Sequence, residues 1–519
     1  MKRRSFIQTA GLASVGIPLL LKEFNFGAVT KQLFKTSRNA EDRVLVIIRL
    51  NGGNDGLNTL IPLDQYDNLV IQRSNVLIPE NQLITLNTTN ALHPSMTGMA
   101  DMFSNGKLSV LQNVGYPEQN RSHFRSMDIW STGLLDVSGT TGWLGRKFDQ
   151  DYPNFPEDYP NASYPDPFAI SMGYEVSSTC QGLMANFSHT VTNPLEVYNS
   201  LQESTEVNDG TYYGSHMEYL STIIAQSNDY GNVVHTAATS GSTLSTMYDA
   251  TNPLAVQLRN VARMISGGLK TKVYILNIDG FDTHDSQAAE NATTTGRHAE
   301  LLKRVSDGVA AFQDDLNLLG LESRVAGMTF SEFGRQVASN ASLGTDHGDA
   351  APLFLFGTCI SSEIIGPNPV INDQIVDQAG VAMQIDFRDV YASILKDWFE
   401  VDPNDVQALF EHTVNFIPVL GACTLGVNEN GFTEADVLVF PNPCADQTTL
   451  RMNSKNELVT IQVRDLFNRL IVEVCSKNFT EGSHDVPVDL SGAASGEYLV
   501  TVSKASGTFT KRFVKVRHI

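Results

Sequence analysis

The sequence has 519 residues, 42% of them hydrophobic, and a formal net charge of -21 at pH 7. This length accommodates one large domain with accessory parts, and the apolar fraction is sufficient for a buried core. The negative charge argues against a broad surface for nucleic acid or for anionic membranes. The five cysteines show no CxxC spacing, so a cysteine-based zinc site is not indicated. Cys444 and Cys475 either pair in an oxidising compartment or stay free, and the sequence does not decide between these.

The N-terminus, MKRRSFIQTAGLASVGIPLLL, has a basic stretch followed by a short apolar run. The run is too short to span a membrane, so residues 1–30 are predicted to be an export signal, and no transmembrane span is expected. Arg3 and Arg4, followed by Ser-Phe-Ile, resemble a twin-arginine signal. A general secretory signal with two arginines is the alternative.

The nearly unbroken apolar run at residues 43–50 predicts a central strand that is buried on both faces. A loop with three glycines follows at residues 51–56 and contains Asp55. Glycine allows close approach of the backbone to a ligand. Asp55 is therefore a candidate ligand-binding acid at the end of a strand, and a glycine-rich turn without a ligand is the alternative.

Residues 95–104 are predicted to form a helix and residues 108–114 a strand. The segment YPEQNRSHFRSMDIWSTG then offers Arg121, Ser122, His123 and Arg125 as a nucleophile or an anion clamp. A surface loop that satisfies its own backbone is the competing interpretation. The chain is polar from about 150 to 251, which indicates a large insertion or cap.

A second group of polar residues follows two further predicted strands. Asp282 and His284 come just after an apolar run that begins at residue 272, and Glu332 follows a strand predicted at residues 324–330. Between them, Leu301, Leu302, Val305, Val309, Phe312, Leu316 and Leu319 recur with helical spacing. The motif LGTDHG adds Asp346 and His347. Ligands of parallel sheets bind outside the carboxyl ends of the strands, so we expect these side chains to converge.

Two imidazoles with carboxylates suit Zn²⁺ or another first-row metal, whereas an all-oxygen set suits Mg²⁺ or Ca²⁺. The candidate metal ligands are Asp55, Asp282, His284, Glu332 and His347. A divalent metal is therefore the expected cofactor, with zinc favoured. The sequence contains no G-x-S-x-G, H-E-x-x-H or G-x-G-x-x-G, which argues against an α/β-hydrolase elbow, a zincin and a dinucleotide-binding fingerprint.

A closing helix is predicted at residues 387–399, and a composition rich in Gly, Asn and Thr marks a linker at residues 421–435. Short β-rich runs from residue 436 to 519 predict a small antiparallel β-sandwich. The main domain is therefore expected at residues 41–420, with the insertion at about 150–251.

The motifs RLNGGNDGLNTLIP, NRSHFRSMDIWSTG, GFDTHDSQ, TFSEFGR and GTDHG resemble, in this order, an uncharacterised bacterial family exported with twin-arginine signals. That family lies within the alkaline phosphatase and sulfatase superfamily. The resemblance implies a three-layer α/β/α sandwich with a mainly parallel sheet, a metal centre at the strand ends, and hydrolysis of phosphate or sulfate esters. In this scheme Ser122 and His123 are candidate catalytic residues, and Arg121, Arg125 and Arg335 are candidate substrate-binding residues.

The sequence departs from the superfamily pattern at several positions. Phe333 stands where a histidine is expected and Glu332 where an aspartate is expected, and no C/S-x-P-x-R motif is present. A second metal would therefore lose a ligand, and the modified nucleophile of ordinary sulfatases cannot form. A non-catalytic binding protein on a degenerate hydrolase scaffold is the alternative function.

The C-terminal run resembles the type A sorting domain of the type IX secretion system, through VFPNP, VRDLFNRLI, VDLSG, SGEYLVTV and KRFVKV. This resemblance implies that the type IX machinery is a partner and that the protein passes through the periplasm to the cell surface or the medium. A carbohydrate-binding or adhesive module of similar fold is the alternative.

Overall fold

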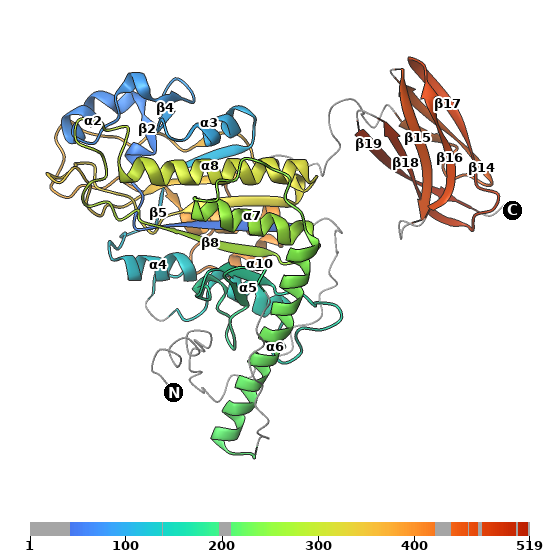
Figure 1. Cartoon of the computed structure of the whole chain (residues 1–519), viewed down its shortest axis with the longest axis horizontal. Coiled ribbons are helices and arrows are strands. Elements are labelled where there is room, and N and C mark those ends of the chain that lie inside the picture. Colours follow the sequence, from blue (N-terminus) through green and yellow to red (C-terminus); the bar gives the residue numbers. More distant parts are fainter. Residues whose placement is uncertain are drawn as a thin grey trace. The chain divides into compact units, whose positions relative to one another are not determined.

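The computed structural model describes residues 42–136, 139–196, 209–420, 437–454, 456–465, 470–504 and 507–516. The chain divides into two compact units, Met1–Cys423 and Thr424–Ile519 (Figure 1). The predicted export signal and the predicted linker lie outside the described residues. No helix in the described part of the chain has the length and apolarity that crossing a membrane requires.

A nine-stranded sheet forms the centre of the first unit, in the order β11-β5-β10-β9-β1-β8-β6-β7, with β12 paired to β5. Its strands are β1 (Val44–Asn51), β5 (Leu108–Gly115), β6 (Ala169–Met172), β7 (Ser188–Val191), β8 (Val273–Asp279), β9 (Val325–Phe330), β10 (Ala351–Phe356), β11 (Ile364–Ile365) and β12 (Ile385–Asp386). β1 pairs in parallel with both β8 and β9, so the strand predicted at residues 43–50 is central.

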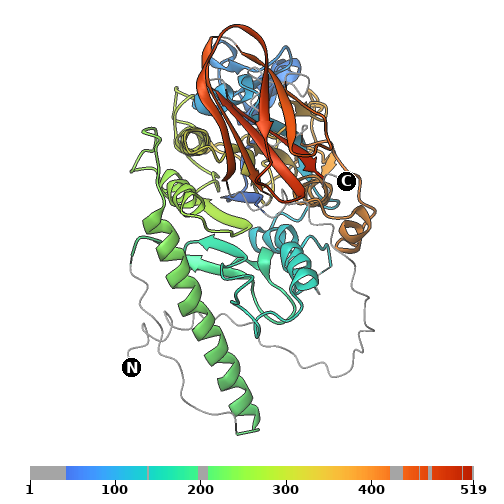
Figure 2. The same ribbon diagram turned by 90° about the vertical axis from the view of Figure 1, so that its right-hand side faces the viewer.

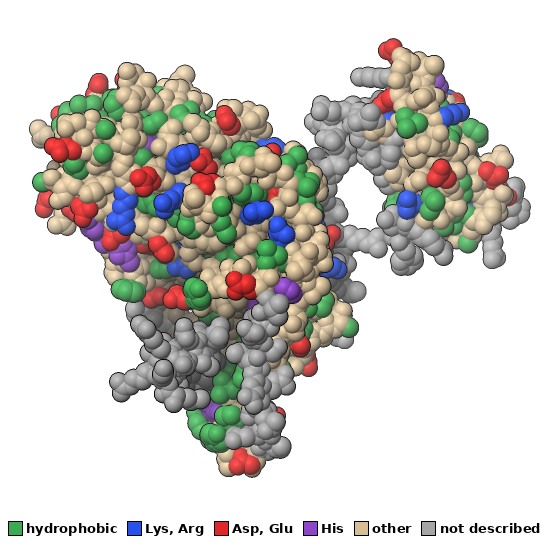
Figure 3. Space-filling view, viewed as in Figure 1, with side chains coloured by type: hydrophobic (Ala, Val, Ile, Leu, Met, Phe, Trp, Pro, Cys, Tyr) green, Lys and Arg blue, Asp and Glu red, His purple; other side chains and the backbone are tan. Residues whose placement is uncertain are grey.

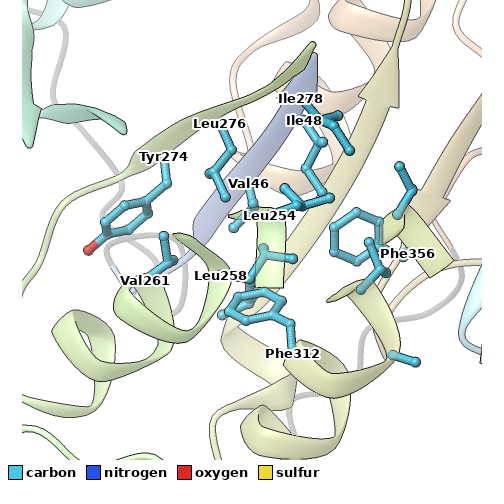
Figure 4. Close-up of a cluster of buried hydrophobic side chains, with 14 of the residues drawn as sticks. Val46, Ile48, Leu254, Leu258, Val261, Tyr274, Leu276, Ile278, Phe312 and Phe356 are labelled. Atoms are coloured by element: carbon cyan, nitrogen blue, oxygen red, sulfur yellow. The ribbon is translucent and has the colours of Figure 1, made fainter. Parts of the chain in front are cut away.

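Alternate residues of β1 pack against helices on opposite faces of the sheet. Val46 and Ile48 belong to the core covered by α3 (Thr97–Ser104), α7 (Pro253–Ser266) and α8 (Arg297–Leu318), part of which Figure 4 shows. Leu45 and Ile47 belong to the core on the other face, with α4 (His123–Thr132), α5 (Trp143–Asp151) and α9 (Phe387–Ser393). Figure 1 shows the two helical layers on either side of the sheet. The predicted α/β class with a mainly parallel sheet is confirmed.

The local signals explain where the helices begin. The side chain of Asn252 accepts hydrogen bonds from the backbone nitrogens of Leu254 and Ala255 and so caps α7, which has Pro253 in its first turn. In α8 the apolar positions from Leu301 to Leu316 are buried, as their spacing predicts. The predicted closing helix is α9 followed by a π-helical turn, Ile394–Trp398.

The range from about 150 to 251 is more than an insertion or cap, because it contributes two strands to the central sheet. β6 pairs in parallel with β8, and β7 pairs with β6. The same range contains α6 (Tyr212–Ser240), a long helix that extends away from the sheet in Figures 1 and 2. The two strands are only four residues long, which is too short for a hydrophobic period to stand out from the polar sequence around them.

β10 is antiparallel to both of its neighbours, β9 and β5. A parallel neighbour would need a crossover connection, usually a helix, whereas residues 331–350 between β9 and β10 contain none. The chain therefore turns back at the carboxyl end of β9. This return places the motif LGTDHG at the edge of the sheet where β1, β8 and β9 end.

Smaller elements complete the first unit. They are β2 (Leu60–Pro62), β3 (Ile84–Thr85) and β4 (Asn90–Leu92), which form a separate sheet, with α2 (Tyr66–Arg73) and α10 (Pro403–Ala408).

The second unit consists of two antiparallel sheets, as predicted. One contains β13 (Val437–Phe440), β14 (Gln447–Ser454) and β17 (Gly482–Asp489), and the other contains β15 (Glu457–Asp465), β16 (Leu470–Phe479), β18 (Gly496–Lys504) and β19 (Gly507–Lys515). Alternate apolar residues, among them Leu450, Ile461 and Val500, form its core. Cys444 and Cys475, considered above as a possible pair, are both free thiols.

Candidate metal centre

Polar side chains from four parts of the chain meet at one edge of the central sheet. Asp282 and His284 follow β8, Glu332 follows β9, and His347 precedes β10. His123 is the first residue of α4, the helix that follows β5. The predicted convergence at the strand ends is therefore what the structure shows, and His123 joins it.

Asp282 lies among three histidines. Its Oδ1 is 3.2 Å from His284 Nε2 and 3.3 Å from His347 Nε2. Its Oδ2 is 3.5 Å from His123 Nε2. The Nε2 atoms of His284 and His347 are 2.9 Å apart. Among the described residues, His123, Asp282 and His347 form a set whose ligand atoms all lie within 4.8 Å of one another.

The other ring nitrogen of each histidine contacts a hydrogen-bond acceptor. These contacts are His123 Nδ1 to Glu332 Oε1 at 2.8 Å, His284 Nδ1 to Asp346 Oδ1 at 2.7 Å, and His347 Nδ1 to the carbonyl oxygen of Arg121 at 2.9 Å. A carbonyl oxygen and an ionised carboxylate can only accept, so each Nδ1 is assigned the hydrogen. In a neutral ring, each Nε2 then presents a lone pair to Asp282.

Three lone pairs facing a carboxylate repel one another unless a positive charge lies between them. His123 Nε2 is buried and has no hydrogen-bond partner, which is costly for a polar atom. Histidines that bind a metal typically donate the hydrogen of the other nitrogen to a carboxylate or carbonyl, as these three do. Nitrogen ligands at about 2.0 Å from a tetrahedral zinc ion lie roughly 3.3 Å apart. The donor set therefore fits a first-row divalent metal.

Arg335 holds Asp282 in place and is not free to bind a substrate. It is 1% exposed. Its guanidinium donates to Asp282 Oδ1 at 2.7 Å and to the backbone carbonyl oxygens of Gly52, Gly53, Phe281 and Thr345. Burial would raise the pKa of Asp282, but the hydrogen bond and charge of Arg335 hold it below its usual value. Asp282 therefore stays ionised.

Glu332 orients His123. Its Oε1 accepts hydrogen bonds from His123 Nδ1 and, at 2.9 Å, from the backbone nitrogen of Gly52. Its backbone carbonyl oxygen accepts from Ser126 Oγ and from Trp130 Nε1. The hydrogen bond from His123 to Glu332 raises the pKa of His123 despite its partial burial. Glu332, predicted as a ligand, thus reaches the cluster around Asp282 only through His123.

Asp346 has the same relation to His284. Its Oδ1 also accepts from Asn340 Nδ2 at 3.2 Å, which fixes the carboxylate. The hydrogen bond from His284 lowers the pKa of Asp346. This orienting role was not predicted from the sequence, although the acid next to His347 in the motif GTDHG is the signal that could have indicated it.

The glycines after β1 allow close approach of two protein segments. Gly52 and Gly53 have φ values of +124° and +83°. A Cβ atom at Gly52 would collide with the backbone of Asp282, and one at Gly53 would collide with the ring of Phe333. The phenyl ring of Phe333 in turn lies beside the imidazoles of His123 and His347, with ring centroids 4.9 and 4.7 Å apart. The two glycines therefore allow Asp282 and Phe333 to pack directly against the loop after β1.

Asp55 does not reach the histidine cluster. It is 1% exposed, and its Oδ1 forms an ion pair with Arg73 Nη1 at 2.9 Å. Its Oδ2 accepts from Gln287 Nε2 at 2.5 Å. Burial would raise the pKa of Asp55, but the charge of Arg73 and these hydrogen bonds keep it lowered. Both oxygens are therefore occupied by protein groups.

The remaining predicted residues lie near the N-terminus of α4. Arg121 forms two hydrogen bonds with the carboxylate of Asp349, at 2.9 and 2.8 Å. Arg125 donates to the carbonyl oxygen of Leu135 at 2.6 Å. Ser122 is exposed at the N-cap of α4 and makes no side-chain capping contact. The two arginines thus have internal partners, whereas the hydroxyl of Ser122 is accessible.

Comparison with curated proteins gives no match. Among solved structures, an alkaline phosphatase superfamily protein from Vibrio parahaemolyticus is 8% identical, with coverage of 87% of this chain and 83% of that chain and a TM-score of 0.33. The PsFucS1 sulfatase from Pseudoalteromonas sp. is 9% identical, with coverage of 88% and 85% and a TM-score of 0.31.

PorZ, a surface component of the type IX secretion system of Porphyromonas gingivalis, is 19% identical over 17% of this chain, with a TM-score of 0.13. The chain spans only 13% of PorZ. Residues 438–516 match the family described as "Secretion system C-terminal sorting domain". This domain implies handling by the type IX secretion system and a secreted or cell-surface protein.

A family model also matches the first unit, over residues 42–410 and thus over most of the chain. The histidine cluster, the glycine loop after β1 and the buried Asp55 network all lie within this range. The chain therefore belongs to the family described as "Protein of unknown function (DUF1501)".

Proposed function

We propose that the chain is an exported metal-dependent hydrolase that acts on phosphate or sulfate esters. His123, Asp282, His284 and His347 would hold the ion, and this set of nitrogen and oxygen ligands favours zinc. The observation that carries this proposal is the direction of the three imidazoles. Each donates its Nδ1 hydrogen to a protein acceptor, and each therefore directs an Nε2 lone pair at Asp282.

A divalent ion in this position supplies polarisation of a phosphoryl or sulfuryl oxygen and lowers the pKa of bound water. The protein groups prepare the site for this chemistry. Glu332 and Asp346 fix the tautomers of His123 and His284, and Arg335 fixes Asp282. The side chains of Asp282 and His284 are 45% and 43% exposed, so a substrate can reach them from solvent.

The nucleophile is either Ser122 or water. The hydroxyl of Ser122 is exposed, has no capping contact and stands next to His123 in the chain. The amino end of α4 also carries a partial positive charge, which favours an anionic group there. The ester class itself rests on the resemblance of the sequence motifs to the alkaline phosphatase and sulfatase superfamily.

A binding protein on the same scaffold is the second candidate. It is favoured by the arginines, because the guanidinium groups of Arg121, Arg125 and Arg335 all contact other parts of the protein. Such a protein would retain the metal centre as a structural or ligand-binding element without turnover.

Metal analysis of the purified chain, with a panel of phosphate and sulfate esters, tests both candidates. His284→Ala and His347→Ala should each lower the bound metal and any esterase activity together. The matched control is His216→Ala, which removes a partly buried imidazole on α6 and should leave both unchanged. A wild-type chain without metal would refute the metal centre, whereas bound metal without turnover on any ester would favour the binding protein.

The export route is a separate proposal, since Arg3 and Arg4 lie outside the described residues. We expect the twin-arginine route, which carries folded proteins and so allows the metal to bind before export. Arg3→Lys together with Arg4→Lys should then retain the precursor in the cytoplasm. Unchanged export would indicate the general secretory route.

We also propose that the unit from residue 436 onward serves sorting alone. It has its own core, with Leu450, Ile461 and Val500 completely buried within it. Deleting residues 436–519 should leave a folded main domain that accumulates in the periplasm. A truncated chain that fails to fold would show that the two units are not independent.

A further inference from the structure

Arg49 is the one charged residue in the largely apolar strand β1. Only Leu50, the last buried residue of the strand, and Asn51 follow it. Its neighbours Leu45 and Ile47, at alternate positions, pack in the core beside α4 and α5. Arg49 therefore points to the same face of the sheet. It lies at the carboxyl edge, where it is half-buried.

The guanidinium of Arg49 makes no hydrogen bond with any described residue, and its buried Nε has no partner. Glu332, Glu175 and Asp279 lie within electrostatic range, but none of them forms an ion pair with it. Glu332 is occupied by His123 and Gly52, and Asp279 by Asn51. Burial lowers the pKa of Arg49, and these acids partly offset the effect. Arginine remains protonated in proteins, so a charged donor is left without an acceptor.

Two unpaired acceptors lie on the same face of the sheet. Asn277 on β8 is the direct register partner of Arg49, and Asn51 is two residues further along β1. The Oδ1 atoms of both asparagines are buried without a hydrogen-bond partner. Asp279, the register partner of Asn51, is exposed, so the cluster opens to solvent at the edge of the sheet.

A ligand that satisfies all three groups must carry an anion for Arg49 and hydrogen-bond donors for the two asparagines. We propose that Arg49, Asn51 and Asn277 form a subsite for a sulfate or phosphate group attached to a hydroxyl-bearing part of the substrate. The subsite lies beside the metal centre, because Gly52, the residue after Asn51, donates a hydrogen bond to Glu332 Oε1, which also accepts from His123 Nδ1. A guanidinium can bind two oxygens of such an anion at once.

This inference deepens the proposed function and rests on it for the identity of the substrate. It assigns recognition of the anion to Arg49, because Arg121, Arg125 and Arg335 have internal partners. It also predicts a substrate with a charged group next to hydroxyls, such as a sulfated or phosphorylated sugar. A simple aryl ester lacks the hydroxyls that the two asparagines require.

Binding of inorganic sulfate to the metal-stripped full chain tests the subsite apart from the metal centre. Sulfate is titrated by calorimetry at constant ionic strength, with chloride as the balancing anion. Arg49→Gln should weaken binding about tenfold to a hundredfold, the effect of losing a hydrogen bond with a charged group. The control Arg259→Gln removes the same charge from an exposed position on α7 and should retain wild-type affinity.

A labelling experiment on the wild-type chain covers the case in which Arg49→Gln does not fold. Phenylglyoxal modifies arginine side chains, and the extent of modification at each position is measured by mass spectrometry of peptides. Sulfate should slow the modification of Arg49 and should not slow that of Arg259. The subsite would be overturned if Arg49→Gln bound sulfate with wild-type affinity, or if Arg259→Gln lost as much affinity as Arg49→Gln. It would also be overturned if sulfate did not slow the labelling of Arg49. None of these results depends on bound metal, so the metal centre can fail or stand independently.

Discussion

Two polar clusters lie at the same edge of the sheet, and each begins with an acid that follows a strand. Around Asp55, every charge has a protein partner: Arg73 and Gln287 occupy its two oxygens. Around Asp282, three imidazole nitrogens approach one carboxylate, and one of them is buried without a partner. The same sequence signal thus produced a closed structural network in one case and an open donor set in the other.

The difference follows from the available counter-charge. Arg73 is completely buried and compensates Asp55 directly, so the network needs nothing from outside the protein. Arg335 compensates Asp282 with a single contact at Oδ1, which leaves the face toward the histidines open. An acid after a strand therefore becomes a ligand-binding group only where its partners leave capacity for a ligand. The predictions below test this distinction.

The largest effect is expected from breaking the closed network. Asp55→Ala leaves the buried guanidinium of Arg73 with the carbonyl oxygen of Gln336 but without a counter-charge, which should cost about 3–5 kcal/mol of unfolding free energy. Tryptophan fluorescence measures this unit alone, because the three tryptophans, Trp130, Trp143 and Trp398, all lie in it. Metal content of the folded variant should equal that of the wild type. A stable variant that loses metal would restore Asp55 as a ligand.

The closed network should also depend on pH. Burial lowers the pKa of His298 to about 4 and that of His93 to about 3. The unfolded chain takes up these protons from about pH 6.5 downward and the folded chain does not, so stability is complete above that pH and decreases toward pH 4. The loss for His298 should be of order 3 kcal/mol.

His298→Gln, which retains a hydrogen-bond donor for Asn54 Oδ1, should flatten this dependence between pH 7 and pH 5. Thermal melting followed by tryptophan fluorescence provides the measurement. An equally steep decrease in the variant would show that other groups cause the acid sensitivity.

A smaller effect is expected from the groups that orient the open cluster. Glu332→Gln keeps the shape but weakens the acceptor for His123, and loss of such a partner typically lowers metal affinity about 10- to 100-fold. Competition with a fluorescent chelator measures the affinity. Glu322→Gln, which changes a carboxylate paired with Lys107 outside the centre, should have no effect. Unchanged affinity in Glu332→Gln would mean that His123 is not a ligand.

The smallest and most specific effect concerns Phe333. Its ring lies beside those of His123 and His347, so Phe333→His would add an imidazole to the open cluster. We expect more bound metal per chain than in the wild type, measured by elemental analysis. Phe333→Leu controls for loss of the aromatic ring. Equal metal content in all three proteins would show that this position does not correspond to the superfamily histidine.

The sequence alone determined the strands that build the site and the order in which they occur. Apolar runs and helical spacing placed β1, β5, β8, β9, α3 and α8, because burial on both faces of a sheet and on one face of a helix imposes these periods. The ends of the predicted strands then indicated which polar residues lie at the edge of the sheet. Short strands in a polar context, β6 and β7, carry too little periodicity to be recognised.

Only the tertiary structure decided which of these polar residues share contacts. His123, Asp282 and His347 come from different segments of the chain, and their convergence depends on the antiparallel return of β10. The partner of each side chain is equally non-local: Arg73 for Asp55, Asp282 for Arg335 and Glu332 for His123. An acid, an arginine or a histidine has the same local sequence signal whether its charge is compensated or free, and only contacts across the fold determine which of these it is.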